Sequence, residues 1–241
     1  MRSSKCVPER HSFVISSQKL LNIATVILTV AAVIVVGVFL QREFSPGKKS
    51  LNAAHVRDWK SFAAGSTRIG SDSPKVVITV FSDILCPHCG AVWRPLTDIT
   101  RKHPRDVAFV YRHSPLYARA PEAARAGICA YRERKFVEIY DAFLALRDSL
   151  GIQAVASKQD SVGVANHWAA LAKGVGISDS IRFLSCMNDP SVANELQSDI
   201  AAGNRLKVGV VPTILINDLR VDGNPGPVVL DSLVRAALSR E

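Results

Sequence analysis

Uncharged positions dominate one long segment near the start of the chain. Residues 20–40 contain no charged side chain and are rich in Val, Ile, Leu and Ala, with Asn22, Thr25 and Thr29 as the clearly polar members. A helix of about 21 residues spans the hydrocarbon core of a bilayer, which is about 30 Å thick. No small-residue cleavage site follows, so the pattern favours an uncleaved transmembrane anchor over a signal peptide, with a buried helix of a soluble protein as the alternative.

The segments on either side of this anchor are polar. Four basic residues lie before it, in residues 1–19, and three follow within ten positions, a distribution that slightly favours a cytoplasmic N-terminus. Residues 41–70 are punctuated by Ser, Pro and Gly, which predicts a tether of low structure. We therefore expect a cytoplasmic tail (1–19), an anchor (20–40), a tether (41–70) and a folded domain (71–241).

Two hydrophobic patterns alternate within the folded domain. Dense Val/Ile runs predict strands buried on both faces, at residues 75–82, 106–111 and 210–217. Amphipathic spacing predicts helices at residues 87–103, in a block from about 117 to 203, and at 230–238. Ser178 and Ser191 are the expected N-caps of two helices in the block. Because such a block cannot extend a sheet, the sequence predicts an α/β fold with an inserted helical subdomain.

The junction between the first of these strands and the next helix carries Cys86-Pro87-His88-Cys89. Two cysteines separated by two residues in the first turn of a helix bring their sulfurs within bonding distance, so they can cycle between dithiol and disulfide. Cys86 stands at the helix start, where unpaired N–H groups and the helix dipole favour its thiolate. Cys89, one turn inside, is expected to resolve the mixed disulfide that Cys86 forms.

The two residues between the cysteines fit an oxidising centre. Pro87 suits the first helical turn because its missing N–H would have no partner there. His88 adds a donor, and sometimes a positive charge, beside the Cys86 sulfur. Stabilising the thiolate stabilises the reduced form, which makes the disulfide a stronger oxidant.

A zinc site is the alternative interpretation of the two cysteines. Zinc usually needs a second ligand pair at comparable spacing, and Cys129 and Cys186 stand alone in the sequence. We therefore favour redox chemistry and expect no metal and no cofactor.

Composition and charge exclude one further class of function. The chain of 241 residues has 48% hydrophobic and 21% charged residues, which is ordinary globular composition. Of its net charge of +9, residues 1–60 carry +6 (nine Lys/Arg against three Asp/Glu), so the excess flanks the anchor. No basic run with interleaved aromatic residues is present, which argues against nucleic-acid binding.

Cys129 and Cys186 both fall in the predicted helical block. A strongly oxidising centre is useful where glutathione does not keep thiols reduced, so we expect the domain to be extracytoplasmic. In such a compartment two neighbouring thiols rarely stay unpaired, which favours a structural disulfide between Cys129 and Cys186. Two buried free thiols are the alternative.

The order of strand, Cys-x-x-Cys helix, strand, helical block, Val-Pro-Thr strand and final helix resembles the thioredoxin fold of the DsbA-like thiol-disulfide oxidoreductases. The most specific pieces are Phe81–Cys89, Phe109–Leu116 and Gly209–Thr213. The resemblance implies that Pro212 is a cis proline lying against the active-site disulfide. It also implies that the Val211 backbone pairs with a substrate peptide as an added strand.

The chain departs from this family pattern at one position. Many members carry an acidic residue six positions before the first cysteine, where this chain has Val80. Proton transfer to or from Cys89 is then expected to use water or Asp83, whose alternative role is that of a turn residue. Arg112 and His113 end a predicted strand near the family's active-site face, and we expect the histidine to be structural.

Together these observations predict an enzyme of the inner membrane, single-pass, with a periplasmic domain that introduces disulfides into exported proteins. Its expected partners are reduced exported proteins and a membrane redox protein that resets the disulfide, which the family resemblance implies to be quinone-linked. A reductase or isomerase of the same fold is the closest alternative. A non-catalytic binding module and a metal-delivery protein are alternatives from other classes.

Overall fold

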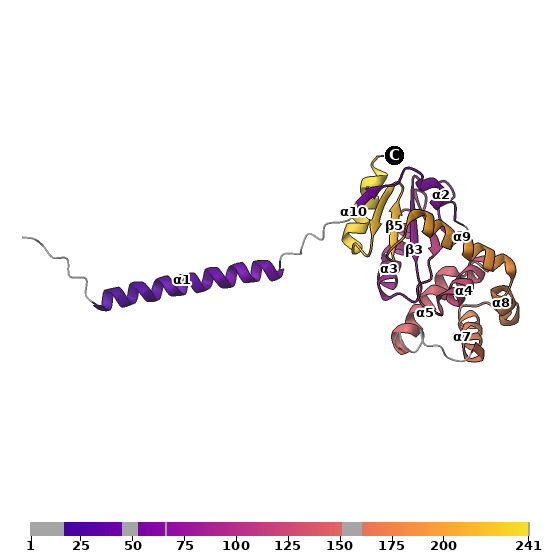
Figure 1. The fold of residues 1–241 in the computed structure, drawn as a ribbon, viewed down its shortest axis with the longest axis horizontal. Coiled ribbons are helices and arrows are strands. Elements are labelled where there is room, and N and C mark those ends of the chain that lie inside the picture. Colours follow the sequence, from indigo (N-terminus) through magenta and orange to yellow (C-terminus); the bar gives the residue numbers. More distant parts are fainter. Residues whose placement is uncertain (1–16, 45–52, 66, 151–160, 241) are drawn as a thin grey trace, which may run out of the picture. The chain divides into compact units, whose positions relative to one another are not determined.

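The computed structural model describes four stretches of the chain, residues 17–44, 53–65, 67–150 and 161–240 (Figure 1). Most of the expected cytoplasmic tail, and residues 45–52 and 66 of the expected tether, lie outside these stretches. The chain divides into two units, one up to Ser50 and one from Leu51 onwards. Each unit is described by itself.

The part of the first unit that the structure describes is helix α1 (Ser17–Phe44). This helix includes the whole uncharged segment of residues 20–40. Large apolar side chains between Val26 and Phe39 are each more than half exposed. Within the described stretches, no helix meets both the length and the hydropathy required of a membrane span. The predicted helix is present, and its role as an anchor stays a prediction.

The second unit is built on a sheet that has six strands among the described residues. In chain order they are β1 (Ala53–His55), β2 (Thr67–Gly70), β3 (Val76–Ser82), β4 (Val107–His113), β5 (Thr213–Ile216) and β6 (Leu219–Asp222). Across the sheet the order is β1-β6-β5-β3-β4-β2, with β3 and β4 parallel and the other neighbours antiparallel. Ser82 lies opposite His113, so β3 and β4 end at the same edge.

Helices cover both faces of this sheet (Figure 1). They are α2 (Trp59–Ala63), α3 (Pro87–Lys102), α9 (Pro190–Leu206) and α10 (Pro227–Leu238). On one face Ile78 and Val80 share a core with apolar residues of α3 and α10. On the other face Phe81 and Leu215 pack against residues of α2 and α9. Every position of β3 and β4 is buried for this reason, which confirms two of the predicted strands.

The sequence predicts that residues 53–70 belong to a tether, whereas the structure includes most of them in the folded unit. Strand β1 pairs with β6, and β2 pairs with β4, so these residues form both edges of the sheet. Phe62 of α2 packs edge-on against Phe81, with ring centroids 6.2 Å apart. The folded unit therefore begins well before residue 71. Short edge strands with one paired side lack the dense apolar pattern that identifies a central strand.

The predicted helical block is present between β4 and β5, with residues 151–160 outside the described stretches. Before α9 it contains α4 (Ala120–Arg132), α5 (Phe136–Leu150), α7 (Ser161–Gly174) and α8 (Ser180–Met187). The helix starts differ by a residue or two from expectation, because Asp179 and Asp189, rather than Ser178 and Ser191, are the N-caps. Each aspartate side chain accepts a backbone N–H of its own helix.

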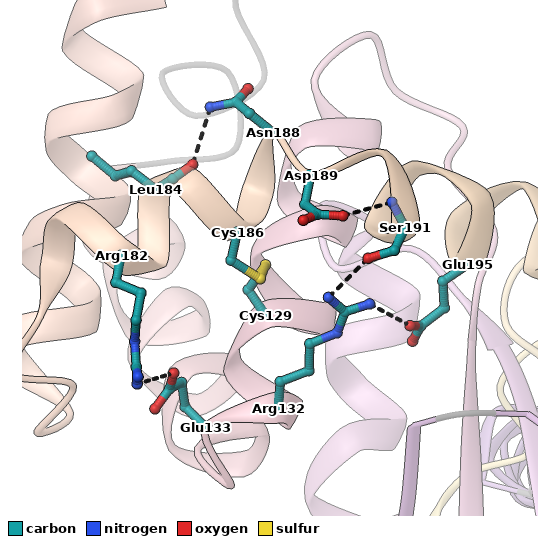
Figure 2. Close-up of a disulfide and its surroundings, with 10 residues drawn as sticks. All are labelled: Cys129, Arg132, Glu133, Arg182, Leu184, Cys186, Asn188, Asp189, Ser191 and Glu195. Atoms are coloured by element: carbon teal, nitrogen blue, oxygen red, sulfur yellow. Dashed lines mark hydrogen bonds and ion pairs between the residues drawn. A yellow bond between two sulfur atoms is a disulfide. The ribbon is translucent and has the colours of Figure 1, made fainter.

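Cys129 of α4 and Cys186 of α8 form a disulfide, with α-carbons 6.0 Å apart (Figure 2). Ion pairs lie on either side of it in the close-up, one between Arg132 and Glu195 and one between Arg182 and Glu133. The bond joins two helices of the insertion at positions 57 residues apart in sequence. The expected structural disulfide is thus confirmed.

Removing this disulfide should destabilise the domain without altering its redox site. For the double variant Cys129→Ala/Cys186→Ala, the chain-entropy model gives a loss in unfolding free energy of roughly 4 kcal/mol for a loop of this length. Urea unfolding measures the loss, and the alkylation rate of Cys86 in the folded variant is the control. An unchanged midpoint, or a large change in Cys86 reactivity, would contradict a purely structural role.

Candidate active site

The predicted redox pair lies at the start of α3. Cys86 is the N-cap residue, with φ −75° and ψ 123°, and Pro87 is the first residue of the helix. The Cys86 carbonyl accepts the N–H groups of Cys89 and Gly90, each at 3.1 Å, which closes the first turn. Both cysteines are free thiols, with only 5% and 1% of their surfaces exposed, whereas Pro87 and His88 are exposed.

The two thiols differ sharply in acidity. The pKa of Cys86 is lowered to about 6, mainly by a hydrogen bond from the Cys89 thiol. The N–H groups of Cys89 and His88 and the charge of His88 lower this pKa further, whereas burial of the thiol raises it. The same hydrogen bond, together with burial, raises the pKa of Cys89. At neutral pH Cys86 is therefore the nucleophilic thiolate and Cys89 the protonated partner.

Val211 and Pro212 lie beside the pair, as the family resemblance implied. The peptide bond between them is cis. The carbonyl oxygen of Val211 lies 3.9 Å from the Cys86 sulfur, and the Val211 side chain packs with Cys86 and Cys89 in a small buried cluster. Cys86, Cys89, Val211 and Pro212 are thus brought to one place from two segments over 120 positions apart.

Asp83 acts in the structure as a turn residue. Its carboxylate accepts three backbone N–H groups, from Leu85 at 2.8 Å, Leu116 at 2.7 Å and Tyr117 at 3.3 Å. Burial raises the pKa of this carboxyl, against the opposing effect of those hydrogen bonds. Its own N–H points at the Cys89 sulfur, at 3.5 Å. The side chain therefore ties the loop after β4 to the active-site turn.

Arg112 and His113 are also structural. The Arg112 guanidinium pairs with the Asp199 carboxylate of α9 at 2.8 Å and donates to the Phe62 carbonyl at 3.0 Å. The second Asp199 oxygen accepts the His113 N–H at 3.0 Å. Burial lowers the pKa of His113 to about 3, so its ring is neutral, packed against Tyr111 with ring centroids 4.8 Å apart.

Sequence reasoning missed Arg147, which approaches the active-site turn from α5. Its side chain is buried and donates to the Cys86 carbonyl at 3.4 Å. A β-carbon on Gly90 would lie only 2.8 Å from both terminal nitrogens of this guanidinium. Gly90 therefore leaves the space that the arginine fills. The glycine directly after the second cysteine is a sequence signal that another side chain packs against this turn. It does not identify that side chain as Arg147.

Comparison with known proteins assigns the family. A family profile described as thioredoxin matches residues 63–236, most of the second unit. The chain belongs to the thioredoxin family. No curated protein matches it.

Solved structures share this thioredoxin fold at low identity. A thioredoxin-like oxidoreductase from Silicibacter pomeroyi DSS-3 is 21% identical, with a TM-score of 0.58, covering 77% of this chain and 96% of its own. The thiol-disulfide exchange protein alpha-DsbA2 from Wolbachia pipientis is 19% identical (TM-score 0.56; 70% and 85% covered). A periplasmic thioredoxin-like protein from Salmonella enterica serovar Typhimurium is 18% identical (TM-score 0.55; 77% and 99% covered). These likenesses confirm the predicted fold, including the resemblance to DsbA-like proteins.

The lowered Cys86 pKa predicts how the thiol reacts with an alkylating reagent. In the reduced protein, the rate of Cys86 alkylation should reach half its plateau near pH 6. Replacing Cys89 by alanine removes the hydrogen bond that lowers the pKa, so the midpoint should move up towards the ordinary value of 9.0. Cys89→Ser keeps a donor and is the matched control, which should stay closer to the wild-type midpoint.

The same pKa makes the stability of the reduced protein depend on pH. Between about pH 6 and pH 9 native Cys86 is ionised while the unfolded thiol still binds a proton, so this contribution to stability grows with pH. It is lost as the pH falls through the folded pKa. Urea unfolding of the reduced protein should show this slope, and Cys86→Ala should reduce it. A wild-type alkylation midpoint near pH 9 would contradict both expectations.

Proposed function

We propose that this protein is a membrane-anchored thiol-disulfide oxidoreductase that introduces disulfides into exported proteins. The observation that carries the proposal is the unequal pair at the start of α3, in which Cys86 has a pKa of about 6 and Cys89 a raised one. A thiolate that is stable at neutral pH is a good leaving group, because a low thiol pKa speeds its departure from a disulfide. The reduced pair is therefore the favoured product.

The reaction begins with Cys86 and Cys89 joined as a disulfide. A substrate thiolate attacks the Cys86 sulfur, the bond to Cys89 breaks, and Cys89 leaves with the electron pair and takes up a proton. A second substrate thiolate attacks the substrate sulfur of the mixed disulfide, and Cys86 leaves as its stable thiolate. The substrate has then lost two electrons to the cysteine pair. A membrane redox partner would restore the disulfide by accepting those electrons.

The surface around Cys86 suits an extended peptide. The backbone before Pro212 lies against the Cys86 sulfur, and Pro212 has no N–H that would compete for the substrate's carbonyl groups. Val210, Leu116 and Tyr117 expose 48%, 65% and 38% of their surfaces. Val211 would pair with the substrate main chain, while these apolar side chains would contact the residues that flank its cysteine.

The proposed location is the inner membrane, with the catalytic domain in the periplasm. The anchor rests on the uncharged segment of residues 20–40, which is long enough to span a bilayer. The disulfide between Cys129 and Cys186 fits an oxidising compartment. The Salmonella protein of the same fold is described as periplasmic, which supports the same location.

A reductase or isomerase of the same fold is the second candidate, because the geometry of the pair serves electron flow in either direction. Metal delivery has less support. Within the described stretches, no group of three or more His, Cys, Asp and Glu side chains is placed to hold a metal ion.

The equilibrium with glutathione measures which direction is favoured. The lowered pKa of Cys86 predicts a reduction potential well above thioredoxin's value of about −270 mV, in the range of about −200 to −120 mV typical of oxidants. Mixtures of reduced and oxidised glutathione, quenched with acid and alkylated, give the fraction of each form. A potential near or below about −270 mV would favour the reductase.

The anchor is tested separately by fractionation. The full-length protein should stay in the membrane pellet through an alkaline carbonate wash, and protease added from outside the cytoplasm should digest the domain. A variant that begins at Leu51 is the control and should be released. Release of the full-length protein, or its conversion to a soluble form starting near residue 41, would contradict an uncleaved anchor.

A further inference from the structure

Arg147 brings a buried positive charge to the start of α3. It belongs to α5 of the helical insertion, and only 9% of its surface is exposed. Its guanidinium donates to the Cys86 carbonyl at 3.4 Å, and the same carbonyl accepts the N–H groups of Cys89 and Gly90. Donors from two distant parts of the chain therefore meet on one oxygen, which belongs to the same residue as the nucleophilic sulfur.

Gly90 shows how closely the guanidinium lies against the first turn of α3. A β-carbon at this position would be 2.8 Å from both terminal nitrogens of Arg147 and 3.1 Å from the end of the Leu144 side chain. Alanine stabilises a helix more than glycine does, so helix formation alone does not favour a glycine here. The glycine instead provides the space that the α5 side chains occupy.

The charge of Arg147 is opposite to the one that a helix start favours. The N-terminal end of a helix carries the positive end of its dipole, so anions stabilise it and cations do not. Burying a guanidinium at such a place is costly unless negative charge compensates it. Cys86 is the N-cap of α3 and bears the thiolate of the site. This thiolate gives a physical reason for a cation at the start of the helix.

The groups of α3 itself that face the Cys86 sulfur favour its thiolate. Hydrogen bonds from Cys89, and then the charge of His88, lower the pKa of Cys86, whereas burial raises it. From the segment before β5, the side chain packed against this sulfur is the apolar Val211. None of these groups connects the sulfur to the helical insertion, whereas Arg147 does.

Two acidic side chains come from other elements near this site. Asp83 lies in the turn before α3, and its carboxylate accepts three backbone N–H groups. Tyr117 lies in the loop after β4. Burial, followed by the charges of Cys86 and Asp83, raises the pKa of its phenol, which is therefore neutral when Cys86 reacts. An ionised Asp83 opposes a second negative charge at this turn, whereas Arg147 favours it.

We propose that Arg147 is a positioning residue for the nucleophile, which holds the first turn of α3 through the Cys86 carbonyl and keeps a positive charge near the Cys86 thiolate. The inference deepens the proposed function and rests on it. An opposite charge stabilises an ionised group, and a fixed first turn keeps the N–H groups of the helix start in place around it. Oxidation to the disulfide removes the negative charge while the guanidinium remains, so Arg147 favours the reduced pair and makes the disulfide a stronger oxidant.

Replacing Arg147 by alanine should raise the pH midpoint of Cys86 alkylation by about one unit, the order of effect that a nearby opposite charge has. At pH 7 the equilibrium with glutathione should shift about fivefold towards the protein disulfide. Arg147→Lys keeps the charge and should restore part of both effects. A residue that only stabilised the fold would change the urea midpoint and leave the alkylation midpoint where it is.

Arg132→Ala is the matched control. It removes an arginine from the same insertion, but one whose partners are Ser191 and Glu195. Its alkylation midpoint and glutathione equilibrium should equal those of the wild type.

Gly90→Ala tests the contact while the arginine is kept. The added methyl group would displace the guanidinium, which is the end of a flexible side chain and can move aside, so the variant should fold. Its alkylation midpoint should rise, although alanine suits the helix better. In Gly90→Ala/Arg147→Ala the two effects should not add, as expected when two substitutions break one contact.

A wild-type alkylation midpoint in either Arg147→Ala or Gly90→Ala would overturn the inference, and so would additive effects in the double variant. An equal rise in Arg132→Ala would indicate a general effect of charge and would also overturn it. If Arg147→Ala does not fold, Gly90→Ala alone decides. A wild-type reduction potential near that of thioredoxin would instead refute the proposed function, whatever the variants show.

Discussion

The structure depends on one junction, where a strand that is buried on both faces runs directly into the first turn of a helix. Because β3 is fixed by helices on both sides, the turn from Ser82 to Cys86 has little freedom, and Asp83 holds it through three backbone hydrogen bonds. This rigidity places one sulfur at the open end of α3 and the other in the core. The reactivity of the pair follows from that difference in position.

Elements far from the junction in sequence keep it in place. The segment before β5 lies against Cys86, with the Val211 carbonyl 3.9 Å from its sulfur, and Arg147 reaches the same turn from the helical insertion. The insertion is in turn fastened by the Cys129–Cys186 disulfide and by the buried pair of Arg112 and Asp199. A buried ion pair of this kind adds little net stability, but it strongly penalises any arrangement that separates its partners. The helical block therefore helps to fix the position of the active-site turn.

The sequence predicted the central strands and the Cys-x-x-Cys helix, because burial on both faces and cysteine spacing leave strong local patterns. It favoured the Cys129–Cys186 disulfide because an oxidising compartment rarely leaves two neighbouring thiols unpaired. It missed β1 and β2, which pair on one side only, and it shifted the caps at Asp179 and Asp189 by a residue or two, since several polar residues there cap equally well. Arg147 could not be assigned to the site. Its role comes from a three-dimensional contact between α5 and the start of α3, which no local pattern records.

The central claim is that Cys86 makes the bond to substrate and that Cys89 can reverse this bond by attacking the Cys86 sulfur, and trapping the bond tests it most directly. Cys89→Ser and Cys86→Ser variants of the full-length protein would be expressed, acid-quenched, alkylated and separated without reductant. The account predicts that Cys89→Ser accumulates covalent complexes with exported proteins, linked through Cys86 as shown by mass spectrometry, and that Cys86→Ser accumulates none. Complexes formed equally by both variants, or through Cys89 alone, would contradict it.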